Sequence, residues 1–322
     1  MSEKTIKTKL QFAAVLMALT VGAQGAHGQT PVAPAPPTAT FKSSVDLVRV
    51  AAVVRDQKGR FVQDLTVKDF EVTDGGRSRP ITDFRQDNAA GVSVALLFDV
   101  SGSMQGLFGH AREAATHVLS WLDVTQDEAA VFRFDTRLEE SMPFTTGLRA
   151  LPPTLATLQP FGATSLLDAI ARTAERVAGR EGRRRAVVVF TDGLDNASRL
   201  TASEVSGIAS SIDVPVYIVA VVAQIDNPAS DIGTASDKSA LVGALADLAS
   251  WTGGHVFVAS TPVERSLAAR QIVDELRHQY LIAFESSGDP GWHRLAINVK
   301  NKKMVVRARS GYIAGQSRPN SL

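Results

Sequence analysis

Between Val92 and Gly254, apolar runs alternate with amphipathic stretches, and this alternation restricts the possible folds more than any other feature of the chain. Continuous apolar runs predict buried strands at 92–98, 129–134, 186–193 and 214–222. Apolar residues at helical spacing predict helices at 107–122, 165–179, 201–212 and 239–254. Strands that alternate with helices imply an α/β fold, a doubly wound and mostly parallel sheet with helices on both faces.

The segments on either side of this region are rich in predicted strands. Residues 45–88 predict four strands with turns at 56–59 and 74–76. After a predicted helix at about 263–277, three further strands are expected at 280–286, 293–300 and 303–312. We expect the two β-rich segments to pair into a small β-sandwich beside the α/β domain.

The N-terminus predicts export. Three lysines precede an uncharged apolar stretch at 10–23, and small residues follow, with Ala26 and Gly28 at positions −3 and −1 of a cleavage site. This pattern is typical of a secretory signal peptide over 1–28. The alternative is a membrane anchor, but the stretch is short for a spanning helix, which needs about 20 apolar residues. No later stretch is suited to span a bilayer, so a periplasmic, cell-surface or secreted protein is expected.

The expected organisation after the signal peptide follows from composition. A linker rich in Pro, Ala and Thr covers 29–40, and the N-terminal β-rich segment covers 41–88. The α/β domain is expected at 91–260, a helix with the C-terminal β-rich segment at 261–314, and a tail at 315–322.

Composition excludes several classes of function. The chain has no cysteine, which removes thiolate metal sites and cysteine nucleophiles. The net charge of +1 gives no reason to expect a nucleic-acid or membrane-surface partner. The basic cluster formed by Arg180 and residues 183–185 is interpreted as a solvated turn.

Oxygen-bearing side chains are placed where the predicted strands end. Asp99, Ser101 and Ser103 follow the strand at 92–98, Thr164 precedes the helix at 165–179, and Asp192 ends the run at 186–193. Ligands of open α/β sheets bind beyond the carboxyl ends of the strands, so these five residues are expected to lie together. Each one alone is also explained as a helix cap or turn residue, but five in this order predict a metal site.

The donor types select the ion. Carboxylate, hydroxyl and water oxygens suit Mg²⁺, with Mn²⁺ and Ca²⁺ as alternatives, whereas Zn²⁺ would prefer His or Cys. Two carboxylates and three hydroxyls do not enclose such an ion, so an outside anion is expected to complete the site. The helix N-terminus that follows Ser103 also favours an incoming carboxylate.

At this point the residues indicate a family. The DVSGS motif at 99–103, followed by GATS at 162–165 and TDG at 191–193, resembles the von Willebrand factor A (VWA) domain and its metal-ion-dependent adhesion site (MIDAS). The flanking segments make residues 45–314 similar to a secreted bacterial VWFA-related family of Acidobacterial type. The resemblance implies a Rossmann-like fold, with Asp99, Ser101, Ser103, Thr164 and Asp192 as ligands of a Mg²⁺-dependent binding domain on an exported protein.

A long polar segment at 224–238 leaves the carboxyl end of the strand at 214–222. Loops of this length in compact domains are usually functional or disordered. We expect it to form part of a partner-binding rim, with Asp226, Asn227 and Asp231 as candidate contact residues.

Three functions are compared. The favoured one is a metal-dependent adhesion module, not an enzyme, that captures an Asp or Glu carboxylate of a protein partner. The second is a Mg²⁺-dependent phosphohydrolase of the haloacid dehalogenase class, which would need a second acid where Ser101 stands. Ser103 is not expected to be a nucleophile either, because no histidine is placed to activate it. A structural cell-envelope protein, in which the metal only stabilises the fold, is the third.

Overall fold

A computed structural model describes residues 47–86, 90–180, 182–211, 213–223 and 236–314, all within one unit that spans 44–322. The predicted signal peptide, the Pro-rich linker and the tail lie outside the described residues. In the described part of the chain, no helix has both the length and the apolar character that crossing a membrane requires.

The expected α/β sheet is confirmed. It has six strands in the order β10-β9-β8-β5-β6-β7. Their bounds are β5 (Val92–Asp99), β6 (Glu128–Phe134), β7 (Leu138–Thr146), β8 (Arg184–Thr191), β9 (Val216–Val221) and β10 (Val256–Ala259). All neighbouring pairs are parallel except β6 and β7. Every residue of β5 is buried, which explains why its sequence is apolar except for Ser93 and the terminal Asp99.

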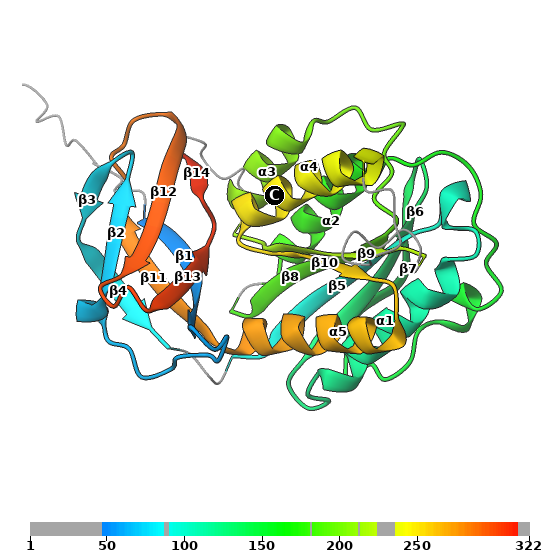
Figure 1. Cartoon of the computed structure of the whole chain (residues 1–322), viewed down its shortest axis with the longest axis horizontal. Helices are drawn as coiled ribbons and strands as arrows, with labels where there is room; N and C mark the ends of the chain where they lie inside the picture. The colour runs from blue at the N-terminus through cyan, green and yellow to red at the C-terminus, as the bar shows by residue number, and fades with distance from the viewer. Residues whose placement is uncertain (1–46, 87–89, 181, 212, 224–235, 315–322) are drawn as a thin grey trace, which may run out of the picture. The chain divides into compact units, whose positions relative to one another are not determined.

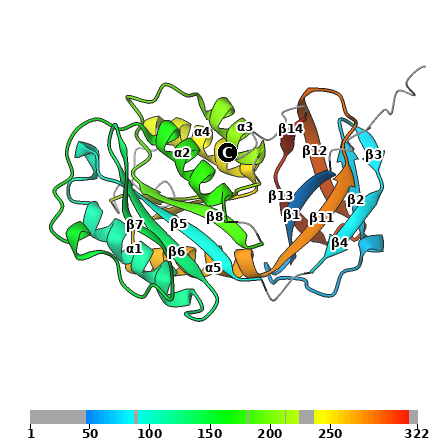
Figure 2. The same cartoon turned by 180° about the vertical axis from the view of Figure 1, so that it is seen from behind.

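Helices cover both faces of this sheet (Figures 1 and 2). The two faces of β5 divide between two cores: Leu96 and Phe98 pack with α1 (Phe108–Trp121) and α5 (Pro262–Arg277). Leu97 packs with α2 (Leu166–Ala178), α3 (Ala202–Ser211) and α4 (Ser236–Thr252). Each fully buried Leu or Phe side chain contributes about 1.5–3 kcal/mol to folding, so both helical layers hold β5 in one register.

The flanking segments form the expected pair of sheets. One sheet has the order β13-β1-β11-β4 and the other β14-β12-β2-β3. The N-terminal strands are β1 (Leu47–Asp56), β2 (Phe70–Asp74), β3 (Arg77–Arg79) and β4 (Ile81–Arg85). The C-terminal strands are β11 (Gln279–Glu285), β12 (Gly291–Val299), β13 (Met304–Ala308) and β14 (Gly311–Ala314). Phe70, Tyr280 and Ile282 belong to the apolar core that both sheets share. We call this pair of sheets the sandwich.

Several elements differ from the sequence expectation. Two strands that were not expected, β7 and β10, lie at the two edges of the sheet. The strand expected after the turn at 56–59 reduces to one bridge between Arg55 and Phe61. The single strand expected at 303–312 is two strands, and each of them joins a different sheet of the sandwich.

The helix α5 packs on the α/β sheet, although the sequence grouped it with the C-terminal β segment. Its N-terminus is capped by Thr261, whose hydroxyl accepts the Glu264 N–H at 3.2 Å. Arg265, which is buried, pairs with Glu113 of α1 at 2.8 Å. The α/β layers therefore extend to Arg277.

A buried carboxylate joins α5 to the sandwich. The side chain of Glu275 is fully buried and accepts a hydrogen bond from Arg55 of β1 at 2.8 Å. It also pairs with Arg307 of β13. Both arginines come from the sandwich, so this network links the two halves of the described chain.

We predict that Glu275→Gln lowers the free energy of unfolding by about 3 kcal/mol, because it removes the charge that two partly buried arginines share. Urea denaturation at pH 7 measures this difference. The matched control is Glu285→Gln at the exposed end of β11, which should change stability by no more than about 0.5 kcal/mol. Equal stability of the two variants would contradict a stabilising role for Glu275.

Candidate metal centre

The centre begins at the carboxyl ends of β5 and β8. The two strands pair in parallel, with Phe98 opposite Phe190, so the next residues of each strand meet at the same edge of the sheet. The Thr191 hydroxyl donates a hydrogen bond to Oδ2 of Asp99 at 2.6 Å, and both side chains are fully buried. This bond fixes the orientation of the Asp99 carboxylate.

The loop after β5 places two hydroxyls beside this carboxylate. The Ser101 N–H donates to Oδ1 of Asp99 at 3.0 Å, and the hydroxyl oxygens of Ser101 and Ser103 lie 3.1 Å apart. A 3₁₀ turn at Gly102–Met104 follows, and the side chain of Met104 is fully buried. The buried methionine therefore holds the turn that carries both serines.

The loop with Thr164 lies directly against this turn. The Gly102 N–H donates to the carbonyl of Gly162 at 2.9 Å, and the Phe161 N–H donates to the carbonyl of Val100 at 2.9 Å. Gly162 has a φ of +92°, which favours glycine. These two backbone bonds bring the GATS motif beside the DVSGS motif.

The loop after β8 completes the arrangement. The Thr164 N–H donates to the side-chain oxygen of Asn196 at 2.9 Å, and the Thr164 carbonyl accepts the backbone N–H of Asn196 at 3.1 Å. Asp192 is partly exposed, and its Oδ1 accepts the Leu194 N–H at 3.1 Å. The structure thus places all five predicted residues on three loops that adjoin at one edge of the sheet.

Other acids near the centre have local roles. Asp195 accepts the N–H groups of Leu167 at the start of α2 and of Ser198 in its own loop, at 3.1 Å each. Asp168 accepts the N–H of Leu200 at 2.9 Å. These carboxylates tie the loop after β8 to α2, which positions Asp192 indirectly.

Sequence reasoning missed Thr191, because a threonine at the end of an apolar run is also an ordinary strand residue. The signal was present, since Thr191 is the first residue of the TDG motif and the only polar side chain of the run at 186–191. Asp226, Asn227 and Asp231, the predicted rim residues, lie outside the described residues.

Burial controls the charge of the centre. It raises the pKa of Asp99 to about 6, against the opposing hydrogen bonds of Ser101 and Thr191. The negative charge of Asp192 raises this pKa further. A buried carboxylate whose ionised form is disfavoured in this way is stabilised by a cation placed beside it.

The donor set fits a hard divalent cation. It contains two carboxylates and three hydroxyls, which are oxygen ligands of the kind that Mg²⁺ binds. Over the described ranges, no group of three or more His, Cys, Asp and Glu side chains is placed to hold a metal ion. If these residues hold an ion, neutral hydroxyls must supply most of the protein ligands.

Comparison with protein families matches residues 94–194 to the von Willebrand factor type A domain. This range contains all five predicted ligands as well as Thr191. A search of curated proteins finds no match. The family match and the doubly wound sheet support a VWA domain within this chain.

Similar solved structures include an aerotolerance-related membrane protein from Bacteroides fragilis, which is 19% identical, with a TM-score of 0.46 over 58% of this chain and 98% of that chain. A von Willebrand factor type A structure from Catenulispora acidiphila is 12% identical, with a TM-score of 0.47 over 83% of this chain and 72% of that chain. The pilus adhesin SpaC from Lactobacillus rhamnosus GG is 8% identical, with a TM-score of 0.45 over 75% of this chain and 47% of that chain.

We predict that Asp99 makes the metal-free protein less stable as the pH rises from about 4 to about 6. The folded-state pKa lies above the usual value, so the stabilising effect of the proton is fully present below pH 4 and is lost as pH rises through 6. The loss amounts to about 3 kcal/mol. Asp99→Asn should remove this part of the pH dependence in urea denaturation, whereas Asp289→Asn, at an exposed position, should not.

Proposed function

We propose that this chain is an exported binding protein whose VWA domain holds Mg²⁺ and captures a carboxylate of a protein partner. The proposed ligands are Asp99, Ser101, Ser103, Thr164 and Asp192. The observation that carries the proposal is the buried Asp99 carboxylate, held by Thr191 and Ser101 at the point where the three loops adjoin. A bound Mg²⁺ would supply positive charge and a coordination position for an acidic side chain of the partner.

The residues of the chain have separate tasks in this proposal. Asp99 supplies the buried negative charge, and the Thr191 hydroxyl keeps its carboxylate in one orientation. Ser101 and Ser103 supply neutral oxygens, which leave the ion more positive than a set of carboxylates would. We assign no catalytic role to the centre, since binding needs only these ligands and one position for the partner.

Two exposed apolar side chains suggest the character of the partner surface. Phe161 is 84% exposed, and its N–H is bonded to the carbonyl of Val100 in the loop after β5. Leu194 is 47% exposed, and its N–H is bonded to Asp192. Exposed aromatic and aliphatic residues beside a polar centre are typical of protein interfaces. We therefore propose that the captured carboxylate belongs to a segment that also presents an apolar side chain.

We predict that calorimetric titration with MgCl₂ or MnCl₂ finds one ion bound per chain, and that Asp99→Ala abolishes this binding. The affinity should fall below pH 6, because protons compete with the ion for Asp99. The matched control is Asp289→Ala, a substitution at an exposed position, which should bind the ion as the natural chain does. Metal binding by a folded Asp99→Ala variant would contradict the proposed site.

We predict that the immobilised protein retains envelope proteins of its own source cells in Mg²⁺ and releases them in EDTA. Asp99→Ala should retain none of them. Phe161→Ser should bind Mg²⁺ normally but retain the partner about tenfold more weakly, since it removes only the apolar contact. If the partner stays bound in EDTA while the melting temperature falls, the metal is structural and the alternative of a structural envelope protein is favoured.

A further inference from the structure

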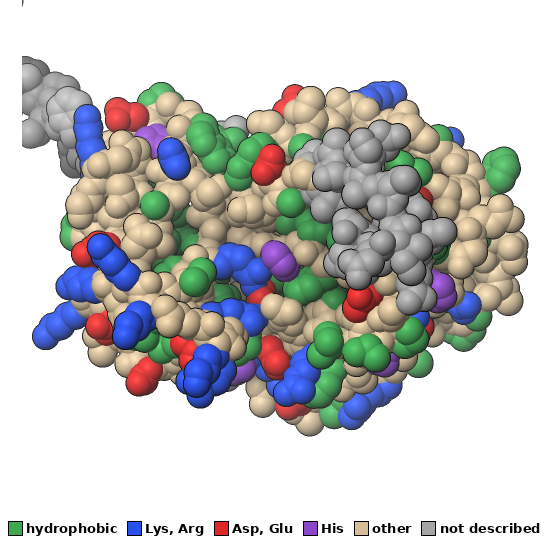
Figure 3. Space-filling view, in the orientation of Figure 1, with side chains coloured by type: hydrophobic (Ala, Val, Ile, Leu, Met, Phe, Trp, Pro, Cys, Tyr) green, Lys and Arg blue, Asp and Glu red, His purple; other side chains and the backbone are tan. Residues whose placement is uncertain are grey.

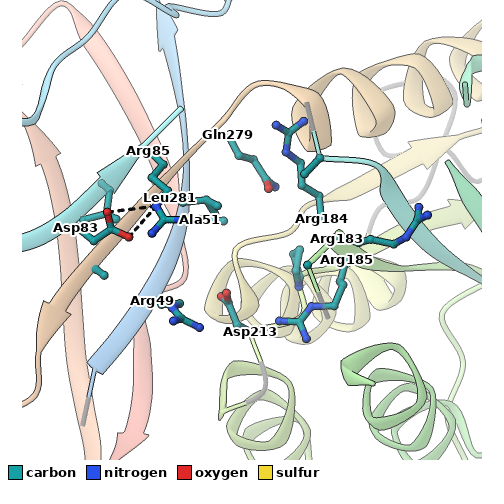
Figure 4. Close-up of a pocket in the computed structure, with 15 residues that line it drawn as sticks. Arg49, Ala51, Asp83, Arg85, Arg183, Arg184, Arg185, Asp213, Gln279 and Leu281 are labelled. Carbon is teal, nitrogen blue, oxygen red and sulfur yellow. Dashed lines mark hydrogen bonds and ion pairs between the residues drawn. The ribbon is translucent and has the colours of Figure 1, made fainter. Parts of the chain in front are cut away.

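A second candidate site lies at the opposite edge of the α/β sheet. A cavity of about 340 Å³ is lined on one side by strands β1, β4 and β11 of the sandwich and on the other by residues 182–185 and Pro215 (Figure 4). Arg184 starts β8 and Thr191 ends it, so seven residue steps of about 3.3 Å separate the cavity edge from the metal centre. None of the five proposed metal ligands lines this cavity.

The lining of the cavity is strongly basic. Among the described residues, five arginines and two aspartates contribute to it, namely Arg49, Arg85, Arg183, Arg184, Arg185, Asp83 and Asp213. The sandwich itself is basic, because residues 47–86 and 279–314 contain fourteen Lys and Arg but only eight Asp and Glu. Figure 3 shows Lys and Arg side chains gathered over the sandwich and its boundary with the α/β layers. The overall charge of +1 conceals this asymmetry.

The arginines are not all neutralised by carboxylates. Arg185 donates to the backbone carbonyl of Ala178 at 2.7 Å, and a carbonyl leaves the positive charge in place. Arg49 is exposed, and its side chain makes no hydrogen bond or ion pair to any residue in the described part of the chain. Figure 4 shows both side chains extending from opposite walls towards the cavity.

The three other arginines of the lining, Arg85, Arg183 and Arg184, are bonded to groups of the protein. Arg85 is paired with Asp83 at 2.9 Å on the sandwich side. Arg183 turns away from the cavity in Figure 4 and donates to the carbonyl of Gln126 at 2.6 Å. Arg184 is buried and donates to the carbonyl of Arg277 at the end of α5, at 3.2 Å. Arg49 and Arg185 are therefore the described arginines of the lining whose charge is available to a ligand, and Arg85 stands beside them in its pair with Asp83.

Uncharged groups complete the lining. Gln279, the first residue of β11, is 6% exposed, and its side chain is directed into the cavity in Figure 4. Ala51, Leu281 and Pro215 add apolar surface between the charged groups. The volume is at the lower end of the range of small-molecule sites, about 300–1,000 Å³. An amide and apolar surface between arginines suit an organic molecule better than a bare inorganic ion.

We propose that this cavity binds a small organic anion with at least two negative groups, carboxylate or phosphate. One group would be held by Arg49 of the sandwich, beside the pair of Arg85 and Asp83, and the other by Arg185 of the α/β domain. Guanidinium groups bind both kinds of anion through charge-assisted hydrogen bonds. Because the arginines belong to different halves of the molecule, a bound ligand would hold the sandwich against the α/β layers.

The test is calorimetric titration of the full chain with citrate and with pyrophosphate, at constant ionic strength. The protein is first passed over a chelating resin, so that no divalent ion at the metal centre can bind the probe. At least one of the two probes should bind and raise the melting temperature, and acetate and chloride should not. The probe that binds more tightly, citrate or pyrophosphate, shows whether the cavity prefers carboxylate or phosphate groups.

Two single substitutions test whether the probe binds in this cavity. Arg49→Gln, at an exposed position, and Arg185→Gln should each weaken binding about tenfold, since each removes one charged contact. Arg77→Gln, an exposed arginine of β3 outside the cavity, should leave binding unchanged. The proposal is overturned if neither probe binds, if acetate binds equally well, or if Arg49→Gln and Arg185→Gln both bind as the natural chain does.

Discussion

The hydrogen bond between the Thr191 hydroxyl and the Asp99 carboxylate is the interaction on which the candidate metal centre depends. It exists because β5 and β8 pair in parallel and end at the same edge of the sheet. A shift of one residue between these strands would exchange the two faces of β5 and expose Leu96 and Phe98 to the wrong helical layer. The packing of both cores thus fixes how these two side chains meet at the edge of the sheet.

The burial of Asp99 disfavours its charged form, and the same burial would favour the binding of a cation. Asp99 is fully buried, and its raised pKa means that the ionised form is disfavoured in the folded protein. A cation bound there would relieve this unfavourable burial of charge, and this relief would add to its binding free energy. By contrast, the buried carboxylate of Glu275 is already paired with Arg55 and Arg307, and these ion pairs join α5 to the sandwich. These two buried acids therefore differ in their surroundings, because Glu275 has two arginine partners and Asp99 accepts hydrogen bonds from neutral groups.

The sequence was sufficient for the parts of the fold that are buried on both faces. Strands such as β5 and β8 have mostly apolar sequences, and four of the five predicted ligands lie at or just after their carboxyl ends, while Thr164 precedes α2. The edge strand β7 was missed because most of its side chains are partly or fully exposed, and its sequence has no apolar run. The solvated turn expected at residues 183–185 is wrong for Arg184, which is buried at the start of β8. Their facing partner Arg49 is more than 130 residues away in the sequence, and no local pattern connects them.

The strand β8 connects the two candidate sites, since Arg184 stands at its first position and Thr191 at its last. A coupling between the sites would require β8 to have two arrangements that the ligands stabilise differently. It pairs with β5 on one edge and with β9 on the other, and nearly all of its residues are buried. A strand held on both edges and both faces has no second register that preserves its core contacts. We therefore expect an anion in the basic cavity to stabilise the joint between the sandwich and the α/β layers without changing the affinity of the metal centre.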